Sequence, residues 1–103
     1  MDIIGVDIPL NYFVEHAGDT GIAAAQNSFN AWHLITTAAE WDNPHQIQGA
    51  HPKASILKGG RVVFNIKAND YRLIAKVDYE DHIVLIRWFG SHADCDKIDA
   101  ETI

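Results

Sequence analysis

Residues 61–89 read RVVFNIKANDYRLIAKVDYEDHIVLIRWF, and apolar and polar side chains alternate along most of this stretch. A period of two residues is typical of a strand that turns one face toward a core. The alternation predicts strands over residues 61–67, 71–78 and 83–89, joined by turns at 68–70 and 79–82. Short turns between successive strands indicate a three-stranded antiparallel meander.

The same alternation assigns each strand residue to a face of the sheet. In the third strand it places Ile83, Leu85, Arg87 and Phe89 together on one face. The sheet face away from the core should carry most of the cationic side chains. We expect this surface to consist of Arg61, Asn65, Lys67, Arg72, Lys76 and Arg87.

The N-terminal half of the chain has a helical pattern. A short β-branched run over residues 2–6 predicts an opening strand at one edge of the sheet, and helices are predicted over residues 9–16, 20–41 and 44 to just before Pro52. Helices that precede a meander and cover one of its faces make an α+β fold, with N-terminal helices packed on a small antiparallel sheet. A length of 103 residues predicts one domain, residues 1–103.

Capping residues mark where two of these helices should begin. Asp19 or Thr20 could cap the long helix. Asn43 and Pro44 suit the N-cap and first position of the next helix, and Gln46 stands where a capping box would reach back. The apolar stripe of the long helix includes Trp32, which we expect to pack on the sheet.

Charge is divided unevenly along the chain, whose net charge is −6. Residues 1–52 contain six carboxylates and no Lys or Arg, whereas residues 53–76 contain six cations and one carboxylate. A local cationic patch can bind a phosphate although the whole chain is acidic, because the field decays over about 8 Å at physiological salt. The meander is therefore the region most suited to a functional site.

Several classes of protein and site are disfavoured by composition. The apolar runs are far shorter than a membrane span, and the N-terminus lacks the basic start of a secretory signal. The single cysteine cannot form an internal disulfide, which suits the cytoplasm. The six histidines have no metal-ligand spacing, so we expect neither a metal site nor a cofactor.

Four segments in order carry a resemblance to a known family. Residues 61–66, 69–73, 86–87 and 90–98 resemble the HigB family of bacterial toxins, within the RelE/ParE-like superfamily. The resemblance extends over about residues 41–103. It implies a RelE-like α+β toxin that associates with the ribosome and cleaves translated mRNA. It also implies neutralisation by a HigA-type helix-turn-helix antitoxin, through which any contact with DNA would be indirect.

The chain departs from the family pattern in three respects. Cys95 stands where an aromatic residue is usual, and the turn that commonly reads Gly-Asn is Ala68-Asn69. The chain is also acidic, whereas toxins of this family tend to be basic. Cys95 and the charge favour an alternative, a RelE-like binding module that engages antitoxin or ribosome without cutting.

Metal-independent RNA cleavage requires a base, an acid and cations around one phosphate. Arg72 and Arg87, on neighbouring strands, could bind the phosphate, and His92 has the side chain suited to proton transfer near neutral pH. A structural interpretation stays open for each: the arginines could pair with Asp78 or Glu80, and His92 could cap a short helix over residues 93–98.

The remaining candidates would bind RNA and not react with it. Lys67 and Lys76 would attract phosphates, Asn65 would orient RNA or satisfy a β-bulge, and Tyr71 would stack on a base or pack in the core. The RNA-binding set predicted from the sequence is Arg61, Asn65, Lys67, Tyr71, Lys76 and Cys95.

Overall fold

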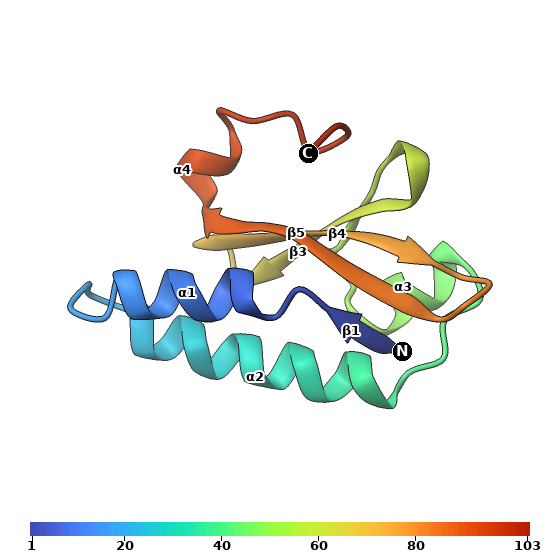
Figure 1. Ribbon diagram of the computed structural model, residues 1–103, viewed down its shortest axis with the longest axis horizontal. Helices are drawn as coiled ribbons and strands as arrows, with labels where there is room; N and C mark the ends of the chain where they lie inside the picture. Colours follow the sequence, from blue (N-terminus) through green and yellow to red (C-terminus); the bar gives the residue numbers. More distant parts are fainter.

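The computed structural model describes residues 1–103 and combines helices with one sheet (Figure 1). The helices are α1 (Asp7–Glu15), α2 (Ile22–Ala38), α3 (Pro44–Ala50), the 3-10 turn η1 (Lys58–Gly60) and α4 (His92–Cys95). The strands are β1 (Asp2–Ile4), β2 (Ser55–Ile56), β3 (Arg61–Ile66), β4 (Tyr71–Asp78) and β5 (Ile83–Ser91). The predicted α+β class is confirmed.

The five strands form one sheet in the order β1-β5-β4-β3-β2. The predicted antiparallel meander of β3, β4 and β5 is confirmed, and β2 adds a short antiparallel strand beyond β3. The prediction of a purely antiparallel sheet is wrong, because β1 pairs parallel to β5 with Asp2 opposite Ile83. No hairpin joins these two strands; the chain between them includes three helices, and a long connection permits parallel pairing.

The helical layer packs on one face of the sheet, as expected. The buried stripe of α2 includes Ala25, Phe29 and Trp32, and the Trp32 ring meets Phe64 of β3 edge-on at 5.3 Å. The helix ends at Ala38, three residues before the predicted boundary, because Ala39 is extended. Trp41 consequently enters the core from the loop after the helix, stacked on Phe64.

The helix starts agree with the capping prediction in one case of two. Asn43 Oδ1 accepts from the Gln46 backbone N–H at 3.1 Å, and Pro44 is the first residue of α3, as predicted. The Gln46 side chain reaches one residue further back than in a capping box, to the Asp42 N–H. Neither Asp19 nor Thr20 caps α2, whose N-cap is Gly21 in the left-handed region.

A β-bulge in β5 overturns the predicted face assignment. Ile86 pairs with Ala75 and Trp88 pairs with Ile74, so Arg87 is an extra residue in β5. Such an insertion reverses the alternation beyond it. Phe89 therefore joins Val84 and Ile86 in the core and does not share a face with Arg87.

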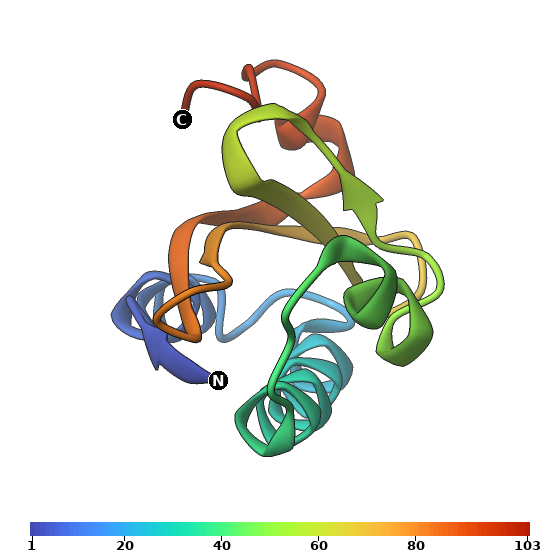
Figure 2. The ribbon, with the colours of Figure 1, turned by 90° about the vertical axis from the view of Figure 1, so that its right-hand side faces the viewer.

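The opposite face of the sheet is partly covered. After α4 the chain runs along the side of the sheet away from α1 and α2 (Figures 1 and 2). Val63 and Ile74, which alternate away from the helical core, are buried at 9% and 0% exposure. The sheet thus lies between a helical layer and the C-terminal segment, residues 96–103.

Candidate functional site

Arg72 is held in one orientation by its surroundings. Its register places it between Asn65 of β3 and Gly90 of β5. Nη1 donates to the backbone oxygens of Asn69 (3.0 Å) and Tyr71 (3.1 Å). Nη2 donates to Asn69 Oδ1 at 2.6 Å and approaches His92 Nδ1 at 2.5 Å. The guanidinium is thus fixed by its own hairpin turn, with Nε left for a further acceptor.

The contact with Arg72 determines where the proton of His92 lies. A guanidinium only donates, so Nδ1 of His92 must accept and the neutral ring carries its proton on Nε2. Nε2 lies 3.4 Å from Asp96 Oδ2, one helical turn further along. Asp96, His92 and Arg72 therefore form a chain of polar contacts that ends at Asn69.

The start of α4 positions the His92 ring. The observed helix covers residues 92–95 and not the predicted 93–98, and its N-cap is Ser91, whose Oγ accepts from Asp94 N at 3.1 Å. The alternative prediction that His92 is the cap is therefore wrong. The His92 backbone N–H donates to Asp70 O at 2.9 Å, which ties α4 to the β3–β4 turn.

Cys95 lies within the electrostatic influence of this cluster. Burial raises the pKa of the Cys95 thiol; the charge of Arg72 acts in the opposite direction, and Asp96 adds to the rise. The half-buried thiol therefore keeps its proton near neutral pH. Cys95 is a small neutral contact beside Arg72.

A hollow of about 460 Å³ opens next to His92. It is lined by Thr20, Lys67, Asn69, Asp70, Tyr71, Ser91, His92 and Ala93. Lys67 contributes an ammonium group that is paired with Asp70 at 3.1 Å. Tyr71 packs mainly as a core residue, with its ring parallel to Phe89 at a centroid distance of 5.9 Å. Three residues predicted from the sequence, Lys67, Tyr71 and His92, thus share this hollow.

Arg61 and Arg87 form a second cluster under the C-terminal segment. Arg61 donates to Ile103 O through Nε (3.1 Å) and Nη2 (2.8 Å), and Arg87 Nε donates to the same oxygen at 3.4 Å. Gly90, the partner of Arg72, is three residues beyond Arg87, which corresponds to about 10 Å along a strand. The structure therefore does not join Arg87 to the Arg72–His92 pair.

Arg72 and Arg87, the two arginines predicted to bind the phosphate, do not pair with an acidic side chain. No Asp or Glu carboxylate lies within ion-pair distance of Arg72 or Arg87. Asp78 instead accepts from the backbone N–H groups of Glu80 and Asp81, both at 3.0 Å. The interpretation of these arginines as partners of Asp78 or Glu80 is wrong.

The last two predicted residues lie away from the hollow. Lys76 is exposed, opposite Arg61 in register, and makes no ion pair. Asn65 faces a different depression, which it shares with Lys53 and Ala68. Both are on the outer sheet face that the alternation predicted, but they do not meet His92.

Trp88 is a residue that the sequence reasoning missed. It pairs with Ile74 and is half-exposed. A Cβ atom added to Gly90 would lie 2.6 Å from Trp88 Cη2, so the indole lies directly across Gly90. Since Gly90 is the strand partner of Arg72, the aromatic ring is a neighbour of the guanidinium cluster. The available sequence signal was a glycine two residues after Trp88, which leaves room for the indole over the strand. The bulge at Arg87 concealed on which face of the sheet the indole lies.

One comparison with known proteins identifies a family. A family model described as HigB_toxin, the RelE-like toxic component of a toxin–antitoxin system, matches residues 25–98. The chain belongs to the HigB toxin family. A comparison with curated proteins found no match.

Membership of the HigB family makes the chain the toxic component of a toxin–antitoxin system and implies an antitoxin partner. The matched residues include Arg72, Trp88, His92 and Cys95, and they leave out β1 and α1. None of the helices is both long and apolar enough to cross a membrane. No three His, Cys, Asp or Glu side chains are grouped as a metal-ligand set.

Proposed function

We propose that this HigB-family chain is a ribosome-dependent endoribonuclease that cleaves translated mRNA without a metal. In this proposal residues 1–103 form one RelE-like domain, which acts in the cytoplasm and is neutralised by a HigA-type helix-turn-helix antitoxin. The observation that carries the proposal is the Arg72 guanidinium, fixed against His92 Nδ1 at the edge of a hollow that Lys67 also lines.

Arg72 would stabilise the negative charge that develops on the scissile phosphate. Asn69 and two backbone oxygens already orient its Nη atoms, so only the contact with His92 Nδ1 must be released when a phosphate arrives. Preorganised donors aimed at developing charge are among the largest contributions to catalysis. The ammonium of Lys67, paired with Asp70, would add a second cation at the same hollow.

His92 would transfer the proton. Its neutral ring presents Nδ1 as an acceptor, and Asp96 near Nε2 would stabilise the imidazolium once the ring gains a proton. For this step the Arg72 donor would leave Nδ1 for a phosphate oxygen, and Nδ1 would take the proton of the attacking 2′-hydroxyl. The 2′-oxygen would bond to phosphorus as the bond to the 5′-oxygen breaks, the 5′-oxygen would leave with a proton from solvent water, and the imidazolium would return its proton to solvent. One substrate group would then both engage the cation and release the base.

The outer sheet face would guide the RNA toward this pair. We assign phosphate contacts to Arg61, Lys76 and Arg87 and a supporting role to Asn65. Arg61 and Arg87 would become available when the C-terminal segment withdraws Ile103 O from them. Trp88 lies along β5 between Arg87 and Gly90, the strand partner of Arg72, and would be the aromatic surface for a base, with Tyr71 and Cys95 as smaller contacts.

The test is cleavage of an mRNA on translating ribosomes by Arg72→Ala and His92→Ala variants. We expect each to lose about 10²- to 10⁴-fold in rate, the usual effect of removing acid–base or charge-stabilising groups. His45→Ala is the matched control, since His45 is exposed on α3 and far from the hollow in sequence. Unchanged cleavage by both variants, or a fall of several degrees in both thermal midpoints, would contradict the assignment.

A binding module without cleavage is the second candidate. It is favoured by two features: Ile103 O occupies Arg61 and Arg87, and Cys95 stands where the family pattern usually has an aromatic residue. The same assay separates the two functions. A folded chain that binds ribosomes and leaves their mRNA intact at saturating concentration supports the binding module.

A further inference from the structure

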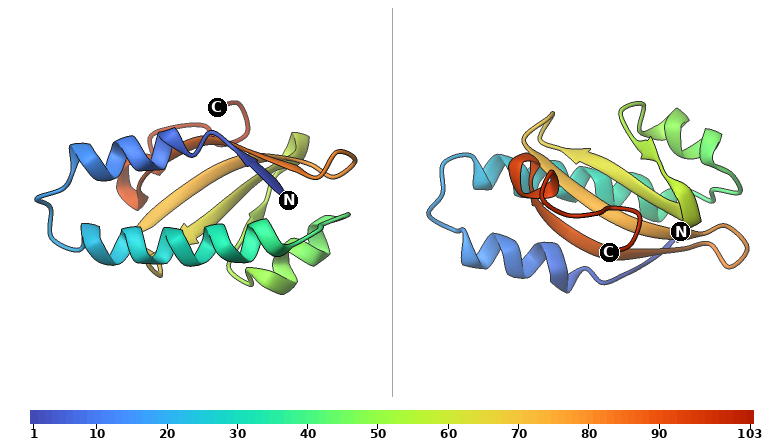
Figure 3. Two further views of the ribbon diagram at one scale, coloured as in Figure 1. Left: turned by 60° about the horizontal axis from the view of Figure 1, so that its bottom comes forward. Right: turned by 90° about the horizontal axis from the view of Figure 1, so that it is seen from above.

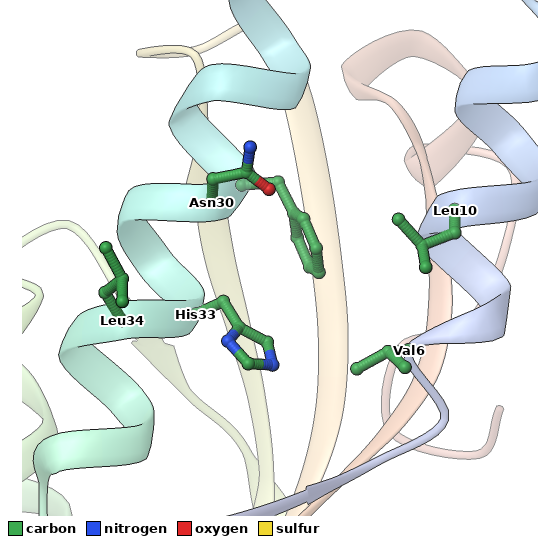
Figure 4. Close-up of a pocket in the computed structure, with 6 residues that line it drawn as sticks. Val6, Leu10, Asn30, His33 and Leu34 are labelled. Carbon is green, nitrogen blue, oxygen red and sulfur yellow. The ribbon is translucent and has the colours of Figure 1, made fainter.

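The helical layer contains an apolar groove that the proposed cleavage site does not use. A groove of about 410 Å³ lies between α1 and α2, lined by Val6, Leu10, Phe29, Asn30, His33 and Leu34. Figure 4 shows Val6 and Leu10 directed toward the α2 side chains, across a gap from His33. Phe29 is buried at 3% exposure and belongs to the core, so the groove leads into the core between the helices.

The borders of this groove expose large apolar side chains. Leu10 is 42% exposed, and Leu34, on the α2 side, is 72% exposed. Val14, one turn after Leu10 on α1, is 77% exposed and extends the apolar stripe along the helix. A single exposed leucine is ordinary, but several exposed apolar side chains around an apolar groove indicate a surface that binds a partner.

The charge around the groove selects the kind of partner. Both helices come from residues 1–52, which carry six carboxylates and no Lys or Arg. Asp7 and Glu15 lie on α1 itself, and Asp19 lies in the loop between the helices. A second copy of this chain would bring the same carboxylates of α1 and of the loop against them, and like charges across an interface are repelled. A cationic partner is complementary.

We propose that the groove between α1 and α2 binds a basic amphipathic helix of the antitoxin. Its apolar residues, spaced at i, i+3 or i+4 and i+7, would fill the groove over Phe29, and its Lys and Arg side chains would face Asp7, Glu15 and Asp19. A helix suits the site because α1 and α2 lie side by side (Figure 3), so that a third helix can pack into the depression between them.

This inference rests on the family's antitoxin partner and not on the cleavage mechanism. Helices α1 and α2 cover the sheet face opposite to the C-terminal segment, whereas Arg72 projects from the outer face of β4. Binding in the groove can therefore be measured in a chain whose cleavage cluster has been removed. Either proposal can therefore be disproved while the other still holds.

The experiment uses the full chain and the antitoxin encoded by the adjacent gene, with affinity measured by calorimetry. Leu10→Lys places a cation in the groove, and we expect it to weaken binding by about 30-fold or more, as for a central interface residue. Ile35→Lys is the matched control: Ile35 is 47% exposed on α2 and does not line the groove, so its affinity should not change. Arg72→Ala should also bind as the unchanged chain does.

Hydrogen exchange on the complex supplies the second measurement. We expect slower exchange in α1, in α2 and in an antitoxin segment rich in Lys and Arg. Asp7→Lys is a further variant on the exposed side of α1, so that a folding failure of Leu10→Lys would not decide the matter. It should weaken binding at low salt and less so at high salt, because exposed charges are screened.

Three results would overturn the proposal. The first is equal affinity of Leu10→Lys, Asp7→Lys and the unchanged chain. The second is a protected antitoxin segment that is acidic, or one that protects only the region around His92. The third is a dimer of this chain alone that Leu10→Lys dissociates, which would make a second copy the occupant.

Discussion

Arg72 shows how one residue can be prepared for binding by its neighbours. Its guanidinium has contacts with Asn69, the Tyr71 backbone and His92, and none with a carboxylate. A carboxylate would neutralise the charge, whereas neutral acceptors orient it and leave it available for an anion. The neutral His92 ring in turn depends on Arg72 for its tautomer. Substitution of either residue should therefore affect both.

Trp88 carries a prediction at the same scale. Trp88→Ala should reduce the affinity for a short single-stranded RNA by about 1–3 kcal/mol, the usual worth of one base stacked on an aromatic side chain. Binding is measured by fluorescence polarisation in a His92→Ala background, so that cleavage does not interfere. Trp88→Phe is the matched control and should retain much of the affinity, since it keeps an aromatic face.

The position of the indole can be tested through Gly90. A methyl group at Gly90 would meet Trp88 Cη2 at 2.6 Å, so Gly90→Ala must tilt the ring without removing it. We expect RNA affinity between those of Trp88→Ala and the unchanged chain. RNA binding that is the same in all of these variants would show that no base stacks on Trp88.

At the scale of elements, two irregular segments decide where the site residues lie. The bulge at Arg87 gives this residue an extra position in β5 and sends Phe89 to the core. The β3–β4 turn brings Asn69 to Arg72 and Asp70 to the His92 backbone. Lys67 and Ala68 in this turn both have positive φ, at 52° and 54°. The turn that shapes the site is therefore strained, because both residues carry a Cβ atom, which disfavours positive φ.

Ala68→Gly should stabilise the protein. Ala68 is in the left-handed region, which costs an L-residue about 1–2 kcal/mol, and glycine avoids this cost while losing up to about 1 kcal/mol in chain entropy. We expect a net gain of about 0.5–1 kcal/mol in the free energy of unfolding, measured by urea denaturation. Ala24→Gly, at an exposed position within α2, is the control and should lower stability by about 1 kcal/mol. Equal losses in both variants would show that the turn is not strained.

Across the whole molecule, the sheet separates two surfaces of different charge and use. The acidic helical layer carries the apolar groove, and the outer face carries the arginines and the C-terminal segment. His51 lies where several parts of the chain meet: its Nε2 is 3.5 Å from Thr36 Oγ1 of α2, and its ring is edge-on to Trp41 and Phe64. Burial lowers the pKa of His51 below its ordinary value of 6.5.

The lowered pKa of His51 predicts loss of stability in mild acid. The unfolded chain gains a proton at this residue as the pH falls through about 6.5, whereas the folded chain resists it, so unfolding becomes more favourable. The contribution of neutral His51 to the free energy of unfolding is complete above that pH and declines below it. We expect a lower thermal midpoint at pH 5.5 than at pH 7.5, with a smaller difference in His51→Gln. His45→Gln, at an exposed histidine, should keep the full difference.

The local features of this protein were predictable from the sequence alone. The period of two located β4 at its observed bounds and β3 and β5 within two residues, and Asn43 with Pro44 marked the start of α3. Each of these depends on neighbouring residues, through side-chain alternation or a cap that bonds to its own helix. The cationic outer face of β3 and β4 was also predictable from this alternation.

Contacts between distant segments were decided only by the tertiary structure. The parallel pairing of β1 with β5 and the bulge at Arg87 depend on which strands become neighbours. The C-terminal segment that engages Arg61 and Arg87 comes from 16 to 42 residues further along the chain. The tertiary structure thus keeps Arg87 apart from Arg72 and brings His92 next to Arg72. No local pattern encodes them, because their free energy arises only when the core has brought the segments together.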